Sequence, residues 1–250
     1  MEDNSREYGQ QFFTLPHDVV PLPSQGKFYK NKKKSIKVGY LTASDENILL
    51  GNTTDITATL LRNKIYEPDM RVDDLLDGDV EAVMIFLRNT SFGPEVNMSL
   101  VDPLTKKQFN TTVTIDELDI IKPKVEPDEE GLFTTLLPKS NSTVKLKLLT
   151  YGDNTEIQRI LDTYPAGRVA PKVTLTLQKQ IIEIDGKTDK GEIAKFIESM
   201  PIADSKHIRK FINENEPRLD MTKVVIAPSG EKLTVNVGFG VEFFRPFFGI

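Results

Sequence analysis

"VVIAPSGEKLTV", residues 224–235, decides the fold of this chain, because an earlier stretch, "NMSLVDPLTKKQF" (residues 97–109), repeats its pattern. Each stretch has an apolar extended lead-in, a turn that contains Pro103 or Pro228, a lysine after the turn and an extended exit. Extended runs on either side of a proline turn are typical of β-hairpins. We therefore predict two β-hairpins that lie far apart in the sequence.

The composition excludes several kinds of chemistry. The chain has 250 residues and no cysteine, which rules out disulfides, thiolate zinc sites and cysteine nucleophiles. Its two histidines, His17 and His207, are too few for a multi-histidine metal site. The net charge of −5 argues against a dedicated nucleic-acid binder. No run of about 18 apolar residues is present and the N-terminus is unlike a signal peptide, so we expect a cytosolic protein without a membrane span.

Helical and extended patterns both occur along the chain, which predicts a mixed α+β fold. Residues 1–43 are predicted to form an extended arm rich in proline and lysine, because proline favours extended backbone. Residues 44–121 should hold a helical segment with the first hairpin. Residues 122–250 should hold an α+β segment with the second hairpin and an aromatic tail. Apolar spacing predicts helices over 44–50, 53–65, 79–93, 153–164, 188–201 and 204–217, and alternation predicts strands around 144–148 and over 172–186.

Several stretches in this order resemble the baseplate hub and tail-assembly proteins of T4-like contractile-tailed bacteriophages. The resemblance is carried by "LPSQGKFY" (22–29), "GYLTASDENILL" (39–50), "DVEAVMIFLRNTSFGPEVNM" (79–98), "IDGKTDKGEIAKFIESMPIADSKHIRKFI" (184–212) and "GFGVEFFRPFF" (238–248). It covers most of the chain. In such proteins the two hairpins often read "C-P-x-C-G" and jointly hold a structural zinc. The resemblance places Asp102, Thr105, Ala227 and Gly230 at the former ligand positions.

These four residues cannot hold zinc as thiolates do, so no metal and no other cofactor is expected. A structural metal contributes folding free energy, and a larger apolar core can replace it. We predict that the two hairpins still pair with each other without metal and so fold the chain back on itself. The alternative is two unrelated proline hairpins that never touch.

Two patches are candidate partner-binding surfaces. The first, "KFYKNKKKSIK" (27–37), surrounds two aromatic residues with lysines, which suits an acidic protein neighbour, a phosphate backbone or simple solvation. The second, "VEFFRPFFGI" (241–250), packs into the protein's own core or inserts into a partner's groove. The candidate residues are Phe28, Tyr29, Lys32, Lys33, Lys34, Phe243, Phe244, Phe247 and Phe248.

No motif indicates an enzyme. His17 with Asp18 lacks a nucleophile pattern nearby, His207 should point to solvent, and the acidic stretch at 125–131 should be an exposed connector. We therefore expect a non-enzymatic phage protein that acts in baseplate hub or tail assembly in the host cytoplasm, as a hub subunit or as an assembly factor. Its partners would be other tail or baseplate proteins, such as the hub or tape-measure protein. The alternative function is a nucleic-acid-associated zinc-ribbon relative that has lost its metal.

Overall fold

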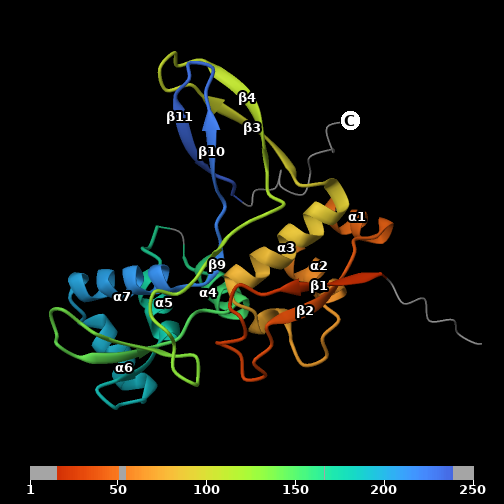
Figure 1. The fold of residues 1–250 in the computed structure, drawn as a ribbon. Coiled ribbons are helices and arrows are strands. Elements are labelled where there is room, and N and C mark those ends of the chain that lie inside the picture. Colours follow the sequence, from red (N-terminus) through yellow and green to blue (C-terminus); the bar gives the residue numbers. More distant parts are fainter. Residues whose placement is uncertain (1–15, 51–54, 166, 239–250) are drawn as a thin grey trace, which may run out of the picture.

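The computed structural model describes residues 16–50, 55–165 and 167–238. Its helices and small antiparallel sheets form an α+β fold, as predicted (Figure 1). The helices are α1 (Ala43–Leu50), α2 (Ile56–Lys64), α3 (Asp77–Phe92), α4 (Tyr151–Asp162), α5 (Lys172–Gln180), α6 (Lys190–Glu198) and α7 (Ile202–Asn215), with a 3-10 turn, η1, at Val72–Asp74. The strands are β1 (His17–Pro21), β2 (Ser35–Gly39), β3 (Glu95–Val101), β4 (Gln108–Thr114), β5 (Ile120–Ile121), β6 (Phe133–Leu136), β7 (Thr143–Leu146), β8 (Ile181–Ile184), β9 (Arg218–Leu219), β10 (Thr222–Ile226) and β11 (Lys232–Asn236).

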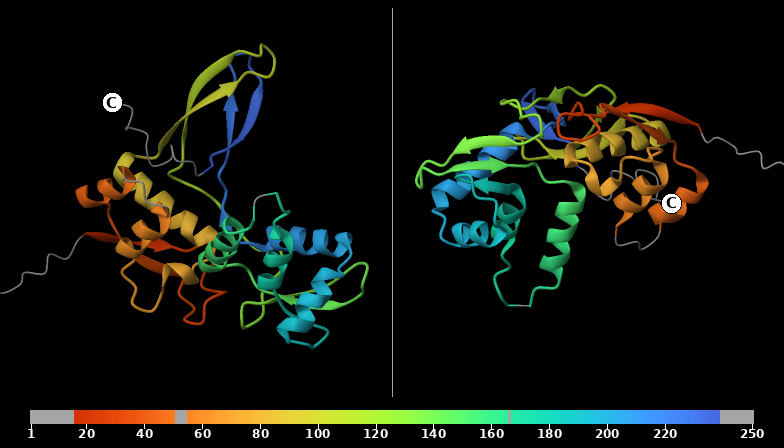
Figure 2. Two further views of the ribbon diagram at one scale, coloured as in Figure 1. Left: turned by 180° about the vertical axis from the view of Figure 1, so that it is seen from behind. Right: turned by 90° about the horizontal axis from the view of Figure 1, so that it is seen from below.

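The molecule has a helical body from which an arm projects. Hairpins β3–β4 and β10–β11 lie side by side in the arm, although more than a hundred residues separate them in sequence (Figures 1 and 2). In the body, the β1–β2 hairpin lies with α1, α2 and α3, while the three-stranded sheet β6–β7–β8 lies with α5, α6 and α7. The short pair β5–β9 lies where the arm meets the body.

Helix α3 joins the body to the arm. The sequence pattern predicted this helix from the spacing of its apolar residues, and Val80, Val83, Met84 and Leu87 are all buried. The helix ends at Gly93, which is its C-cap, and β3 begins directly after it. The first arm hairpin is therefore fixed in direction by a buried helix.

The described part of the predicted N-terminal arm, residues 16–43 (the N-terminal segment below), is packed onto the body. Strands β1 and β2 pair in register from His17 with Gly39 to Pro21 with Ser35. Apolar side chains from both strands and from the loop between them lie in the main core. That core also draws on residues from each of the other two predicted segments. Burial of this apolar surface holds the N-terminal segment to the body, since the hydrophobic effect scales with the area removed from water.

A buried carboxylate anchors the loop between β1 and β2. Asp79 on α3 is inaccessible to solvent and accepts hydrogen bonds from the Ser24 N–H (2.9 Å) and the Tyr29 hydroxyl. The same hydroxyl accepts the N–H of Leu76 (2.9 Å). Burial raises the pKa of Asp79 and of Tyr29. The stretch "PSQGKFY" thus serves to fasten this loop onto α3.

The prediction of one strand over 172–186 is wrong in its first part. Residues 172–180 form α5, and only residues 181–184 form a strand, β8. The alternating "VTLTL" pattern favours a strand, but Leu177, Gln180 and Ile181 are buried at helical spacing against the core. Packing between helices decided the conformation here, as tertiary context overrides weak local preference.

Candidate protein interface: the paired hairpins

The two arm hairpins have similar but unequal turns. Strands β3 and β4 pair up to Val101 with Gln108, so residues 102–107 form the first turn. Strands β10 and β11 pair up to Ile226 with Lys232, so residues 227–231 form the second turn, which is one residue shorter. Each turn is closed by a main-chain hydrogen bond, from Asp102 N–H to the Lys107 carbonyl (2.9 Å) and from Ala227 N–H to the Glu231 carbonyl (2.8 Å).

A second apolar core lies between the hairpins. Both contribute buried or half-buried side chains to it, and Ile85 on α3 closes it at the base. The members are Ile85, Val113, Ile115, Met221, Val225 and Val237, with Val96, Met98, Leu100, Phe109, Leu118, Leu219, Leu233 and Val235 packed against them. The two hairpins therefore pack against each other, as predicted, through apolar side chains.

Asp102 joins the two turns. Its side chain is buried, and its Oδ1 accepts the N–H groups of Leu104 (2.9 Å) and Thr105 (3.1 Å) in its own turn. From the other turn, the Ser229 hydroxyl donates to Oδ1 (2.8 Å) and the Ser229 N–H donates to Oδ2 (3.0 Å). Burial alone would raise the pKa of Asp102, but these hydrogen bonds outweigh it and hold the pKa at about 2. An ionised carboxylate thus holds the tips of the arm together at neutral pH.

The four residues that the resemblance places at zinc-ligand positions are arranged unequally. Asp102 and Ala227 are buried, while Thr105 and Gly230 are exposed. Gly230 has a φ of +90°, which disfavours any larger residue there. In the described residues, no group of three or more His, Cys, Asp or Glu side chains could hold a metal ion. The contact between the turns is instead the Asp102–Ser229 pair.

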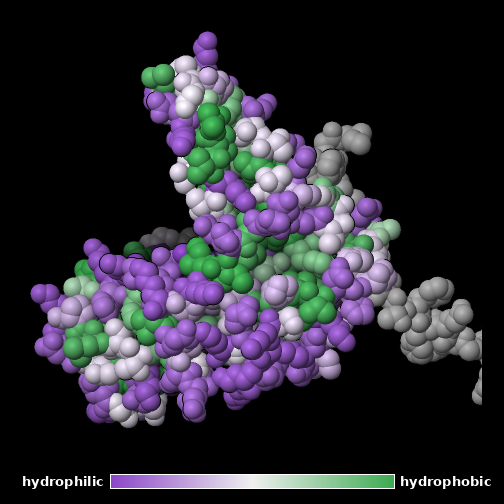
Figure 3. Space-filling model, viewed as in Figure 1, coloured by the Kyte–Doolittle hydropathy of each residue, from purple (hydrophilic) through white to green (hydrophobic). Residues whose placement is uncertain are grey.

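The outer surfaces of the two hairpins differ. On β3–β4 the outward side chains form polar cross-strand pairs, Gln108 with Ser99 (2.6 Å) and Thr112 with Asn97 (2.8 Å). Aliphatic side chains are exposed on β10, at the end of β3 and in the first turn, and Figure 3 shows hydrophobic groups gathered along the arm. The exposed fractions are 64% for Val224, 67% for Ile226, 57% for Val101 and 68% for Leu104. The two residues on β10, Val224 and Ile226, lie on the same strand face and are called the aliphatic arm surface below.

The aromatic residues of the predicted basic patch face inward. Tyr29 is buried, and its hydroxyl donates a hydrogen bond to Asp79. Phe28 is half-buried, and its ring centroid lies 5.7 Å from that of Phe133. Neither offers a free face on which a nucleotide base could stack. The aromatic half of the nucleic-acid interpretation therefore has no support in this structure.

The lysines of the same patch have different surroundings. Lys33 pairs with Glu67 and Asp69, which lie in the loop after α2. The Lys32 ammonium donates to main-chain carbonyl oxygens, and Lys34 is exposed. The sequence reasoning did not anticipate the acidic partners of Lys33, because they come from a segment more than thirty residues away.

Three further predictions concern the tail, His207 and the acidic connector. Phe243, Phe244, Phe247 and Phe248 lie outside the described residues. His207 does not simply face solvent: its Nε2 lies 3.0 Å from the Thr135 hydroxyl, and its ring stacks on Phe211. It therefore helps to connect α7 to β6. The prediction of an exposed connector over 125–131 is confirmed for residues 125, 126 and 128–130, whereas Pro127 is half-buried and Gly131 is buried.

A group of carboxylates lies at the base of the arm. Asp77 and Glu81 on α3 and Glu216 just before β9 interact electrostatically with one another and with Arg218. Burial, reinforced by Asp77 and Glu81 and opposed by Arg218, raises the pKa of Glu216 to about 7. Burial also raises the pKa of Asp77 and of Glu81. The charge state at this junction therefore changes near neutral pH.

Comparison with known proteins identifies the family of this chain. In the part of the chain that the structure describes, no helix is both long and apolar enough to cross a membrane. None of the curated proteins and none of the solved structures compared with the chain matches it. The family model described as "T4 bacteriophage base plate protein" matches residues 19–244, which include the body and both arm hairpins. The chain therefore belongs to the family of T4 bacteriophage base plate proteins.

Proposed function

We propose that this chain is a non-enzymatic protein of baseplate hub or tail assembly, and that its arm binds other tail or baseplate proteins. Membership of the base plate family supports the general role. The observation that carries the specific proposal is the aliphatic arm surface. It stands on a projecting element whose shape is held by its own apolar core and by the Asp102–Ser229 contact.

The physical argument rests on exposure. Leaving Val224 and Ile226 more than 60% exposed on one strand face forgoes the stabilisation that burial of aliphatic side chains gives. Clustered exposed aliphatic side chains on a rigid element are typical of protein interaction sites. Because the arm is already ordered, binding would require little further loss of conformational entropy.

The variant Val224→Ser/Ile226→Ser tests the role of the arm. It should fold and melt near the unchanged protein, because both side chains are already exposed, yet it should not support formation of complete baseplates during infection. The matched control is Thr112→Ser on the polar outer face of β3–β4, which should support assembly fully. Normal baseplate formation with the double variant would refute the proposed role of the arm.

The choice between a hub subunit and an assembly factor needs a separate experiment. A hub subunit would be present in purified particles at fixed copy number. An assembly factor would be found in the infected lysate and be missing from finished particles. Quantitative mass spectrometry of both samples separates these roles, and we favour hub assembly as the description that includes both. A protein absent from baseplate intermediates as well as particles would contradict the proposal.

We also propose that the hairpins are a metal-free counterpart of a zinc-binding pair, in which the Asp102–Ser229 contact takes over the joining role of the metal. The positions of Asp102 and Ala227 at equivalent turn starts support this ancestry. The variant Asp102→Cys/Thr105→Cys/Ala227→Cys/Gly230→Cys tests it directly, although Gly230 has a positive φ and one turn is shorter. The variant should bind one zinc per chain and melt higher with it. A variant that ignores zinc would refute the ancestry.

A further inference from the structure

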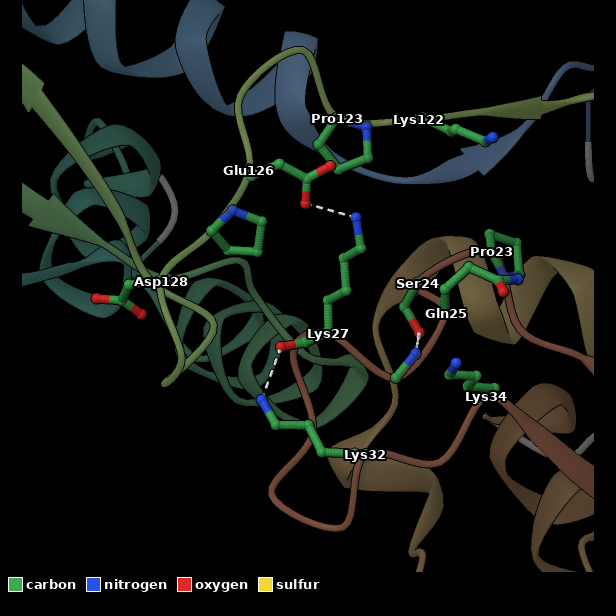
Figure 4. Close-up of a pocket in the computed structure, with 12 residues that line it drawn as sticks. Pro23, Ser24, Gln25, Lys27, Lys32, Lys34, Lys122, Pro123, Glu126 and Asp128 are labelled. Atoms are coloured by element: carbon green, nitrogen blue, oxygen red, sulfur yellow. Dashed lines mark hydrogen bonds and ion pairs between the residues drawn. The ribbon is translucent and has the colours of Figure 1, made fainter.

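A cleft separates the β1–β2 loop from the connector after β5. It has a volume of about 630 Å³ and lies between residues 23–34 of the loop and residues 122–128 of the connector (Figure 4). This volume is within the range of ligand-binding pockets. The cleft is in the body, and none of the residues of the aliphatic arm surface lines it.

Positive charge in the cleft is only partly balanced. Four lysines line it, and Lys27 forms an ion pair with Glu126 (Figure 4). The ammonium group of Lys32 donates to two neutral main-chain carbonyl oxygens, at 2.7 and 3.3 Å. Lys34 and Lys122 are exposed, and neither forms an ion pair with the described residues. Three ammonium groups therefore border the cleft without a carboxylate partner.

The second acidic residue of the lining is already engaged. The Oδ1 of Asp128 accepts the N–H groups of Glu130 (3.0 Å) and Leu132 (2.8 Å) and so closes the turn after the connector. In Figure 4 its carboxylate points away from the lysines. Asp128 thus does not neutralise them.

The walls of the cleft are held in place before any ligand binds. The Ser24 N–H is bonded to the buried Asp79, which fixes one wall to α3. Gly26 has a φ of +72°, and a Cβ there would lie 2.4 Å from the Lys32 carbonyl oxygen, so the loop closes tightly on itself. Three prolines, at positions 23, 123 and 127, add rigid apolar surface.

We propose that this cleft binds an acidic, extended peptide segment of a partner protein. Carboxylates of the segment would pair with Lys32, Lys34 and Lys122, and its aliphatic groups would lie against the prolines. The inference rests on the proposed function in taking the partner to be another baseplate protein. A nucleic acid fits less well, because none of the described residues that line the cleft has an aromatic side chain on which a base could stack.

The test uses the full chain and a short capped peptide of aspartate and glutamate as the probe. Backbone amide NMR shifts at about 0.15 M salt should change in residues 24–34 and 122–128, and binding should weaken as the salt concentration rises. The variant Lys34→Gln/Lys122→Gln should lower the affinity about tenfold, since two exposed ion pairs are lost. The control Lys30→Gln removes an exposed lysine of the same loop that does not line the cleft, and should change the affinity less than twofold.

Several outcomes would overturn the proposal. Equal weakening by Lys30→Gln would mean that the peptide responds only to the overall charge of the loop. Amide NMR shifts spread over lysines elsewhere on the body would likewise mean that the peptide responds only to overall charge. Tighter binding of a single-stranded oligonucleotide than of the peptide would replace the proposed partner with nucleic acid. Melting curves of both variants are the check that substitution leaves the fold intact. Failure of the peptide to bind would not affect the proposed role in baseplate hub or tail assembly, because the mass spectrometry experiment tests that role independently.

Discussion

Replacing Glu216 by glutamine should remove a pH-dependent weakness at the base of the arm. Glu216 is largely buried beside Asp77 and Glu81, and its pKa is raised from the ordinary 4.5 to about 7. Because the folded protein holds this proton more tightly than the unfolded chain does, ionisation opposes folding. The penalty begins as the pH rises through about 4.5, grows up to about 7 and is constant above that.

The magnitude follows from the two pKa values. Each pKa unit corresponds to about 1.36 kcal/mol, so a change from 4.5 to about 7 costs on the order of 3 kcal/mol of unfolding free energy once the group is ionised. At pH 5 most of this penalty is absent, and at pH 8 all of it is present. Glu216→Gln should therefore gain on the order of 2–3 kcal/mol more at pH 8 than at pH 5, relative to the unchanged protein.

Urea unfolding followed by far-ultraviolet circular dichroism measures this difference, since the chain has no tryptophan. The matched control is Glu231→Gln in the second turn, where the side chain is exposed. This control should leave the unfolding free energy nearly unchanged at both pH values. An effect of Glu216→Gln that is the same at pH 5 and pH 8, or a loss of stability at pH 8, would show that Glu216 is not held protonated by its surroundings.

The remaining predictions concern the turns, the loop anchor and metal. Asp102→Ala should speed amide hydrogen exchange at Ser229 about tenfold or more, because that N–H loses its acceptor. In the unchanged protein the protection of the Ser229 N–H, relative to its intrinsic exchange rate at each pH, should start to fall below about pH 3.8 and be largely lost near pH 2, where the folded Asp102 takes up its proton; protection unaffected by either change would contradict the role of the Asp102–Ser229 contact. Tyr29→Phe should cost about 1–3 kcal/mol in chemical unfolding, since Asp79 and the Leu76 N–H each lose a partner, while Tyr40→Phe at a more exposed pair should cost less. Elemental analysis should find no stoichiometric zinc, and a chelator should leave the melting temperature unchanged; a chelator-sensitive melt would contradict the metal-free arm.

The sequence by itself determined the class of the elements and much of their placement. The apolar spacing of α3, α6 and α7 and the proline turns of the two hairpins are local patterns, so they could be found without knowing what packs against them. The absence of cysteine likewise excluded a thiolate metal site from composition alone. The resemblance to baseplate proteins rested on residues in this same order, and the family match confirms it.

Only the tertiary structure decided which residues meet. Asp102 and Ser229 are 127 positions apart, and Ser24 and Asp79 are 55 apart, so no local pattern connects either pair. The same holds for the helix at 172–180, where burial of Leu177 and of Ile181 just after it outweighed a strand-like alternation. Local propensities differ by a few tenths of a kcal/mol per residue, whereas burying a large aliphatic side chain contributes about 1.5–3 kcal/mol. Contacts made in the folded core therefore settle what the local sequence leaves open.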